Sequence, residues 1–287
     1  MPAAGASYWA DPAKHAWDGL WMSGPGVRER INRRVTGDEG LWPIAWLPTV
    51  VPDRAPFPRA ASIGSGLGAF ERSLVELGVV QSVTGIDVNT EIVAEAERRA
   101  AAGIGRDRIR YVAGDARELL RSAGPFEAIF FHESLHHFDR LAELLDLVRG
   151  ALAPRGILYL DEYVGPARSE WTWRHLLEWN LVYRRVPEAF RRTRIIRRPI
   201  SAEDPTEAIA SSDILPEVAR RFRILARRDY GGNLLGAIYP SLLRPDQPDG
   251  PSPERFARLL ADLLDREDRL LAAGRESFQA VVVAEPL

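Results

Sequence analysis

The stretch Ser62-Ile-Gly-Ser-Gly-Leu-Gly68 follows a short apolar run, Arg59–Ile63, and precedes an amphipathic stretch, Ala69–Leu77. Glycines let a ligand approach the backbone closely, and the free N–H groups at the start of a helix attract an anion. A strand, a glycine loop and a helix in this order therefore predict a cofactor site. With Ala69 in the last place the same letters also fit the dinucleotide fingerprint, so the loop alone leaves the cofactor open.

Apolar and amphipathic segments continue to alternate beyond the loop. Strands are predicted at 82–86, 109–113, 128–132 and 157–161, and helices at 90–101 and 140–152. Such alternation is typical of α/β proteins with a parallel sheet. The end of the chain adds strands at 221–228 and 278–285 around a long helix at 253–273.

Four segments are predicted along the chain. They are an N-terminal helical cap and linker (1–58), a cofactor-binding core (59–162), an inserted helical cap (163–215) and C-terminal strands with a helix that complete the sheet (216–287). Residues 1–50 hold five of the eight tryptophans, Trp9, Trp17, Trp21, Trp42 and Trp46, which fits short helices packed on a larger body. The proline-rich stretch Leu47–Pro58 is expected to contain neither helix nor central strand.

Composition excludes several classes of protein. The chain has no cysteine, which removes disulfides, thiolate zinc sites and cysteine nucleophiles, and Lys14 is its only lysine. A net charge of −2 creates no overall field toward nucleic acid or an acidic membrane. The first ten residues lack a signal-peptide pattern, and no stretch has the ~18 consecutive apolar residues of a membrane span. We therefore expect a cytoplasmic protein that binds neither nucleic acid nor membrane; its oligomeric state is not predicted.

Two acidic residues follow predicted strands. Asp87 ends the run Gly85-Ile-Asp87, where a carboxylate can accept hydrogen bonds from the ribose of a nucleotide cofactor. Asp115 follows the third predicted strand, on the side where an adenine ring would lie. A helix cap is the alternative role for Asp115.

Together these segments resemble the class I S-adenosylmethionine-dependent methyltransferases. Ser62–Gly68 resembles their first motif, Gly85–Asp87 the ribose-binding acid, and Gly114–Ala116 the adenine-side motif, while Leu135–Phe138 and Leu152–Leu158 resemble two later motifs. The resemblance implies a Rossmann-like three-layer sandwich with a seven-stranded, mostly parallel sheet whose last strand is antiparallel. It also implies S-adenosylmethionine as cofactor, in a bacterial type of enzyme with helical N-terminal and inserted cap segments.

The resemblance further implies roles for single residues. The amides around Gly64 and Gly66 would hold the methionine part of the cofactor, Asp87 the ribose, and Asp115 with Ala116 the adenine. The full set expected at the cofactor is Ile63, Gly64, Ser65, Gly66, Gly68, Asp87, Val88, Asp115, Ala116 and His132. One departure is that Ser62 stands where the family often has an acid, and Glu71 is expected to replace part of that function.

The run from Phe131 to His137 follows the fourth predicted strand and holds three of the five histidines. Methyl transfer is an in-line displacement, so the nucleophile, the methyl group and the sulfur must be aligned and water must be excluded. It needs a general base when the acceptor is a hydroxyl. His136 is the first candidate for this base, with Glu133 and His137 as further catalytic candidates. A buried structural role is the alternative for each histidine. Although the letters His-Glu-x-x-His match a zinc-protease signature, His132 lies at a strand end, so no metal is predicted.

Residues expected to contact the acceptor are Glu162, Tyr163, Trp171 and Tyr230. Trp171, Trp173, Trp179 and Tyr183 have helical spacing, which favours an apolar packing face over an aromatic cage. Seven arginines lie between Arg184 and Arg198. A solvated face is the favoured interpretation, and a phosphate- or carboxylate-bearing acceptor is the alternative.

The function predicted from the sequence is therefore methyl transfer from S-adenosylmethionine to a small-molecule acceptor, such as a natural-product or glycan intermediate with a hydroxyl or amine. Two alternatives remain open. One is an NAD(P)-dependent oxidoreductase built on the same glycine loop, and the other is a non-catalytic cofactor-binding module. The sequence does not fix the acceptor atom.

Overall fold

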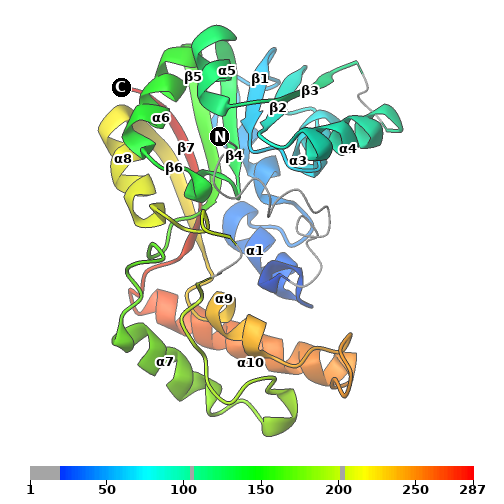
Figure 1. Ribbon diagram of the computed structural model, residues 1–287, viewed down its shortest axis with the longest axis vertical. Helices are drawn as coiled ribbons and strands as arrows, with labels where there is room; N and C mark the ends of the chain where they lie inside the picture. Colours follow the sequence, from blue (N-terminus) through cyan, green and yellow to red (C-terminus); the bar gives the residue numbers. More distant parts are fainter. Residues whose placement is uncertain (1–19, 104–106, 201–203) are drawn as a thin grey trace.

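The computed structural model describes residues 20–103, 107–200 and 204–287, so Trp9 and Trp17 lie outside the described residues. Within these ranges one sheet has seven strands in the order β3-β2-β1-β4-β5-β7-β6 (Figure 1). The strands are β1 (Ala60–Ile63), β2 (Val83–Asp87), β3 (Ile109–Ala113), β4 (Phe126–His132), β5 (Leu152–Tyr163), β6 (Phe222–Gly231) and β7 (Gln279–Pro286). Strands β1 to β5 are mutually parallel, and β7 runs antiparallel to both β5 and β6. The predicted fold class, a mostly parallel Rossmann-like sheet, is confirmed.

Helices cover both faces of the sheet, because successive side chains of a strand point to opposite sides. Ile129 and Phe131 of β4 pack toward α5 (Ala116–Ser122), α6 (Leu141–Ala151) and α8 (Ile214–Arg221). Phe130 of the same strand belongs to the core on the other side, with α1 (Val27–Thr36), α3 (Ala69–Glu76) and α4 (Thr90–Ala101). The result is a three-layer sandwich.

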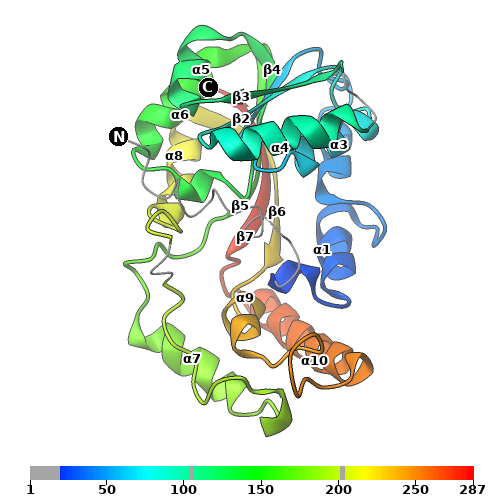
Figure 2. The same ribbon diagram turned by 45° about the vertical axis from the view of Figure 1, so that its right-hand side comes forward.

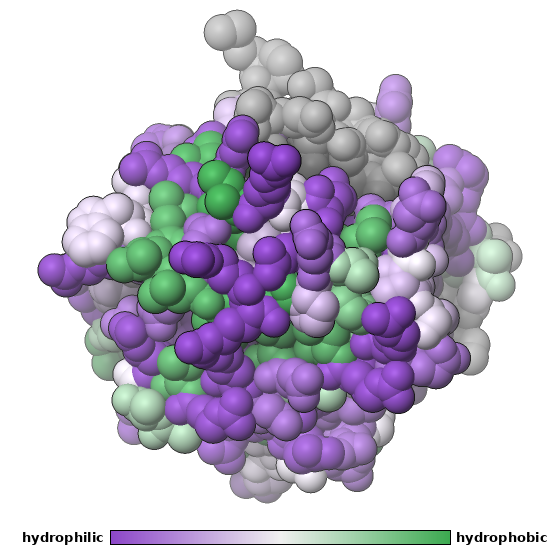
Figure 3. Space-filling view, turned by 90° about the horizontal axis from the view of Figure 1, so that it is seen from below, coloured by the Kyte–Doolittle hydropathy of each residue, from purple (hydrophilic) through white to green (hydrophobic). Residues whose placement is uncertain are grey.

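A separate group of helices lies beyond the carboxyl ends of the parallel strands. It consists of α7 (Trp173–Tyr183), α9 (Leu235–Ile238) and α10 (Pro253–Ala272), and α1 lies between this group and the sheet (Figures 1 and 2). On α7 the side chains of Trp173, Leu177 and Leu181 follow one another at four-residue intervals and are all exposed. The face seen from below carries such hydrophobic patches among charged side chains (Figure 3).

Some local expectations need correction. The proline-rich stretch contains a short helix, α2 (Leu47–Val50), because Pro48 lies in its first turn, where a missing N–H costs no hydrogen bond. Helices α5 and α8 were not predicted, and β5 begins at Leu152 rather than at residue 157. Within the described ranges, no helix combines the length and apolarity needed to cross a bilayer.

Candidate functional site

The glycine loop is held between two neighbouring strands. The amides of Gly64 and Ser65 both donate to the Ile86 carbonyl at 2.9 Å, and the Gly66 amide donates to Asp87 Oδ2 at 3.0 Å. Gly64 has a φ of +75°, and a Cβ there would lie 2.6 Å from Cβ of Ser134. Only glycine fits this position, so the backbone of the loop borders the space above β1 directly.

The carboxylates of Asp87 and Asp115 already accept hydrogen bonds from backbone amides. Asp87 Oδ1 accepts from the Asn89 amide at 3.0 Å, so both of its oxygens hold backbone around the loop. Asp115 is the N-cap of α5 and accepts from the Arg117 amide at 2.7 Å. The helix-cap role weighed for Asp115 is therefore present. Each carboxylate oxygen retains a lone pair for a ribose or adenine donor.

Glu71, in the first turn of α3, is the least satisfied polar group beside the loop. Its side chain is fully buried, and neither carboxylate oxygen has a hydrogen-bond partner among the described residues. Burial raises the pKa of Glu71 to about 7. Ser65 Oγ is likewise buried, with no hydrogen-bond partner in the described part of the chain. Orphaned polar atoms next to exposed loop backbone fit a polar ligand such as the amino-acid part of S-adenosylmethionine.

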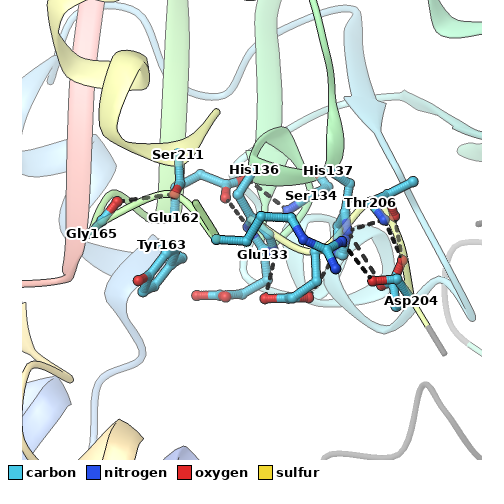
Figure 4. Close-up of polar contacts among 12 residues, drawn as sticks. Glu133, Ser134, His136, His137, Glu162, Tyr163, Gly165, Asp204, Thr206 and Ser211 are labelled. Carbon is cyan, nitrogen blue, oxygen red and sulfur yellow. Dashed lines mark hydrogen bonds and ion pairs between the residues drawn. The ribbon is translucent and has the colours of Figure 1, made fainter. Parts of the chain in front are cut away.

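Glu162 organises the turn that follows β4. This fully buried carboxylate accepts from the amides of Ser134 at 2.7 Å and Leu135 at 2.6 Å through Oε1. Its Oε2 accepts from Nδ1 of His136 at 2.8 Å, as Figure 4 shows. Glu162 thus orients the histidine-bearing turn and does not line the cavity described below, although the sequence placed it at the acceptor.

The two adjacent histidines differ in charge. Burial alone would lower the pKa of His136, but the hydrogen bond to Glu162 and the charges of Glu207 and Glu133 outweigh it and raise the pKa to about 10. Burial and the neighbouring His136 charge hold the pKa of His137 well below its usual range. At neutral pH His136 therefore carries the proton and His137 is neutral. This order opposes the role of His136 as the first candidate for a base.

Glu133 and Asp161 lie beside the histidines at the ends of β4 and β5. Burial, only partly offset by the His136 charge, raises the pKa of Glu133 well above its usual range. The Tyr230 hydroxyl donates to Asp161 Oδ1 at 2.7 Å and lies 3.3 Å from Glu133 Oε1, so Tyr230 contacts both acidic side chains. The ring of His132 stacks on Phe70 with centroids 4.5 Å apart.

One cavity of about 1000 Å³ joins the glycine loop to the histidine turn. Of the predicted residues, those lining it are Gly64, Ser65, Gly66, His132, Glu133, His136, His137, Tyr163 and Trp171. The others, Ile63, Gly68, Asp87, Val88, Asp115, Ala116, Glu162 and Tyr230, lie outside its lining, with the Val88 side chain exposed at the end of β2. The ribose and adenine half of the predicted cofactor site therefore lies outside this cavity, at an edge where Val88 and Asp115 are exposed.

Several lining residues were missed by the sequence prediction. Asp161 lies near the carboxyl end of β5 as Asp87 ends β2, and that strand-end position was a usable signal. Glu207, Trp21 and Phe278 also line the cavity, but they come from distant segments that carry no motif.

The arginine-rich stretch is used structurally at two positions. Arg191 donates to the carbonyls of Val186 and Arg184, and Arg192 donates to that of Pro240. The aromatic residues near α7 divide in two: Trp179 and Tyr183 are buried in the core, as the packing interpretation expects, whereas Trp173 is 66% exposed.

Comparisons with known proteins support the assignment of the core. Residues 60–156 match the model of a family described as a methyltransferase domain. An uncharacterized protein of Synechococcus sp. (strain ATCC 27144 / PCC 6301 / SAUG 1402/1) is 28% identical over 113 residues, which are 39% of this chain and 27% of that protein. The chain thus matches only about a quarter of the length of this relative.

Two solved structures are similar in fold. The geranyl diphosphate C-methyltransferase of Streptomyces coelicolor A3(2) has a TM-score of 0.55 at 15% identity, with 100% of both chains covered. Phosphoethanolamine N-methyltransferase 2 of Haemonchus contortus has a TM-score of 0.50 at 16% identity, covering 86% of this chain and 53% of that one. Residues 60–156 thus match a methyltransferase domain, and the seven-stranded sheet that contains them has the Rossmann-like fold.

Proposed function

We propose that this protein is an S-adenosylmethionine-dependent methyltransferase that acts on a small-molecule acceptor. The observation that carries the proposal is the continuity of the cavity, which runs from the glycine loop and the unsatisfied Glu71 to the histidine turn. Its volume of about 1000 Å³ lies at the upper end for ligand pockets, which suits a cofactor and an acceptor together.

In this proposal the loop amides and Glu71 bind the methionine part of the cofactor. Asp87 binds the ribose, and Asp115 with Ala116 borders the adenine at the exposed edge. The sulfonium of the bound cofactor supplies an electrophilic methyl group. Phe70 and His132 then form the wall between the cofactor half and the acceptor half of the cavity.

We place the acceptor against His136, His137 and Glu133, with Tyr163 and Trp171 on the apolar side. The turn that carries the histidines is fixed by three hydrogen bonds to Glu162, so these side chains are held in one geometry before the acceptor binds. Such preorganisation is what an in-line displacement requires. The buried aromatic side chains Trp171 and Trp179 keep water from the acceptor end.

The test is calorimetric binding of S-adenosylhomocysteine to the purified protein. We expect saturable binding that Asp87→Ala weakens at least about 100-fold, because the variant loses both the ribose acceptor and the bond that holds the Gly66 amide. Asp87→Asn, which keeps the side-chain shape, should weaken binding less. Asp262→Ala, at an exposed position of α10, is the matched control. If the wild type binds no S-adenosylhomocysteine, the proposal is wrong.

A further inference from the structure

Beyond the methyl-transfer site, three side chains at its acceptor end form a cluster with the composition of a metal site. They are His136, His137 and Glu207, and each offers one ligand atom within 4.8 Å of the other two. His136 Nε2 lies 3.9 Å from Glu207 Oε1, and His137 Nε2 lies 3.8 Å from Glu207 Oε2. All three line the cavity.

The Nδ1 atom of each histidine lies next to a side-chain oxygen, on the side of the ring away from Glu207. His136 Nδ1 donates to Glu162, and His137 Nδ1 lies 3.2 Å from Thr206 Oγ1 and 3.7 Å from Asp204 Oδ2 (Figure 4). Both Nε2 atoms consequently face Glu207. In protein metal sites a ligating histidine almost always donates its other ring nitrogen to a carboxylate, carbonyl or water, which fixes the ring and its tautomer.

The third ligand comes from a segment that is fastened to the domain. The Arg168 side chain donates to the carbonyls of Asp204 and Pro205, and the Arg168 amide donates to that of Ala208 at 2.7 Å. The bonded residues lie on both sides of Glu207 in the sequence. Its carboxylate is 40% exposed and therefore able to move. A metal at about 2.1 Å from three ligands needs them roughly 3.4 Å apart, so shifts of less than about 1 Å complete the site.

The charge around the cluster also favours a cation. Glu162 Oε2 lies 2.8 Å from Nδ1 of His136 and Glu207 Oε1 lies 3.9 Å from its Nε2, so two carboxylates flank this imidazole. A bound divalent ion would take the place of the Nε2 proton of His136, while Nδ1 keeps the proton that it donates to Glu162. The positive charge among the carboxylates is thereby retained and increased.

We propose that His136, His137 and Glu207 bind a divalent transition-metal ion at the acceptor end of the cavity. Two imidazoles and one carboxylate favour Zn²⁺ or Co²⁺ over Mg²⁺ and leave coordination positions open toward the cavity. This replaces the expectation of no metal, which rested on His132, and His132 stacks on Phe70 outside the cluster. A consequence that rests on the proposed function is that the acceptor binds the ion through an oxygen, as a carboxylate or phosphate does.

The test is titration of chelator-treated protein with ZnCl₂, MgCl₂ and CoCl₂, followed by calorimetry and, for Co²⁺, by visible absorption. We expect one Zn²⁺ per chain, bound at least 10-fold more tightly than Mg²⁺. His137→Gln and Glu207→Gln should each weaken Zn²⁺ binding at least 10-fold. His175→Gln and Glu188→Gln, which remove the same side-chain types elsewhere, should leave it unchanged. Circular dichroism checks that each variant is folded.

Absence of saturable Zn²⁺ and Co²⁺ binding would overturn the proposal, as would equal binding by the wild type, His137→Gln and Glu207→Gln. Addition of acetate should shift the Co²⁺ spectrum, and an unchanged spectrum would overturn the claim of open positions. S-adenosylhomocysteine binding, measured on the same samples, separates the two proposals. Cofactor binding without metal binding contradicts only the metal site, and metal binding without cofactor binding contradicts only the methyltransferase assignment.

Discussion

We propose that Glu71 replaces the acid that Ser62 lacks beside the glycine loop. Ser62, in β1, is buried where related domains often have an acid, and the carboxylate of Glu71 enters the same region from α3. In this proposal the acid comes from α3 and not from the glycine motif itself. A pattern limited to residues 62–68 misses it, whereas the first turn of the following helix contains it.

The burial of Glu71 makes the stability of the cofactor-free protein depend on pH. Its pKa is raised from 4.5 to about 7, so the folded state holds a proton that the unfolded state releases between these values. Stability attributable to this group is thus present below about pH 4.5 and is lost as the pH rises through 7, by about 3 kcal/mol in total. In urea unfolding, the free energy of unfolding of Glu71→Gln should rise by about 2.5 kcal/mol relative to that of the wild type between pH 5 and pH 8. If the difference in unfolding free energy between Glu71→Gln and the wild type does not change with pH, the Glu71 carboxyl group is not buried and unpaired.

The same substitution should have the opposite effect on ligand binding. If Glu71 contacts the ammonium group of the cofactor, Glu71→Gln removes a charge-assisted hydrogen bond worth about 1.5 to 3 kcal/mol. S-adenosylhomocysteine should therefore bind roughly 10- to 100-fold more weakly at pH 8, as measured by calorimetry. Glu97→Gln, at an exposed position of α4 that does not line the cavity, is the control. Unchanged affinity would place Glu71 out of reach of the ligand.

Glu162 is expected to be a structural residue at the histidine turn. Its two oxygens accept three hydrogen bonds in a fully buried place, and Glu162→Gln leaves one carbonyl oxygen and introduces two donors. We expect a loss of about 2 to 4 kcal/mol in the free energy of unfolding, measured in urea. The exposed Glu188→Gln should change it by less than about 0.5 kcal/mol. An equally small loss for Glu162→Gln would show that the turn is held by other contacts.

At the scale of elements, the strand-loop-helix unit at β1 and α3 allows a clean test of the glycine requirement. Gly64 and Gly26 share a φ of +75°, but a Cβ at Gly64 meets Ser134 at 2.6 Å, whereas one at Gly26 has none of the described atoms within 4 Å. Gly26→Ala therefore measures the backbone cost alone, about 1 to 2 kcal/mol. Gly64→Ala adds the clash, so its loss of stability should be larger and should be accompanied by loss of S-adenosylhomocysteine binding. Equal losses in thermal unfolding would contradict the close packing of the loop.

The predictability of these elements follows from their periodicity. Helix α4 and strand β3 have exactly the predicted ranges, because Asn89 caps the helix and the apolar alternation of β3 is regular. Helix α5 was missed because its seven residues, including charged Arg117 and Glu118, give a weak pattern. Short helix α2 was missed because prolines were read as breakers when one of them lies in the first turn. Glu207 was missed because its place beside His136 depends on contacts made far along the chain.

At the scale of the whole molecule, the cavity is lined by segments that are distant in sequence. Trp21 comes from the N-terminal part, His136 from the loop after β4, Trp171 from the approach to α7 and Phe278 from the start of β7. A ligand that fills the cavity bridges all of them and stabilises the folded chain as one unit.

This bridging predicts a measurable thermal shift. S-adenosylhomocysteine at 100 times its dissociation constant should add about 2.7 kcal/mol, or a few degrees in Tm for a chain of this size. The emission of Trp21, Trp171 and Trp179, all at the cavity, should change over the same concentration range. NADH at equal concentration is the comparison that tests the alternative cofactor. A shift with NADH and none with S-adenosylhomocysteine would favour the oxidoreductase.

The family match ends at residue 156, but Tyr163, Trp171, Glu207 and Phe278, which surround the acceptor end, all come after it. Much of the acceptor end therefore lies outside the part of the chain that contains the glycine loop. The glycine loop, which we propose binds the methyl donor, lies within the matched range, whereas the acceptor end combines His136 and His137 of that range with these later segments. Grafting those later segments from a relative onto this core is accordingly a route to exchange the accepted molecule without rebuilding the donor site.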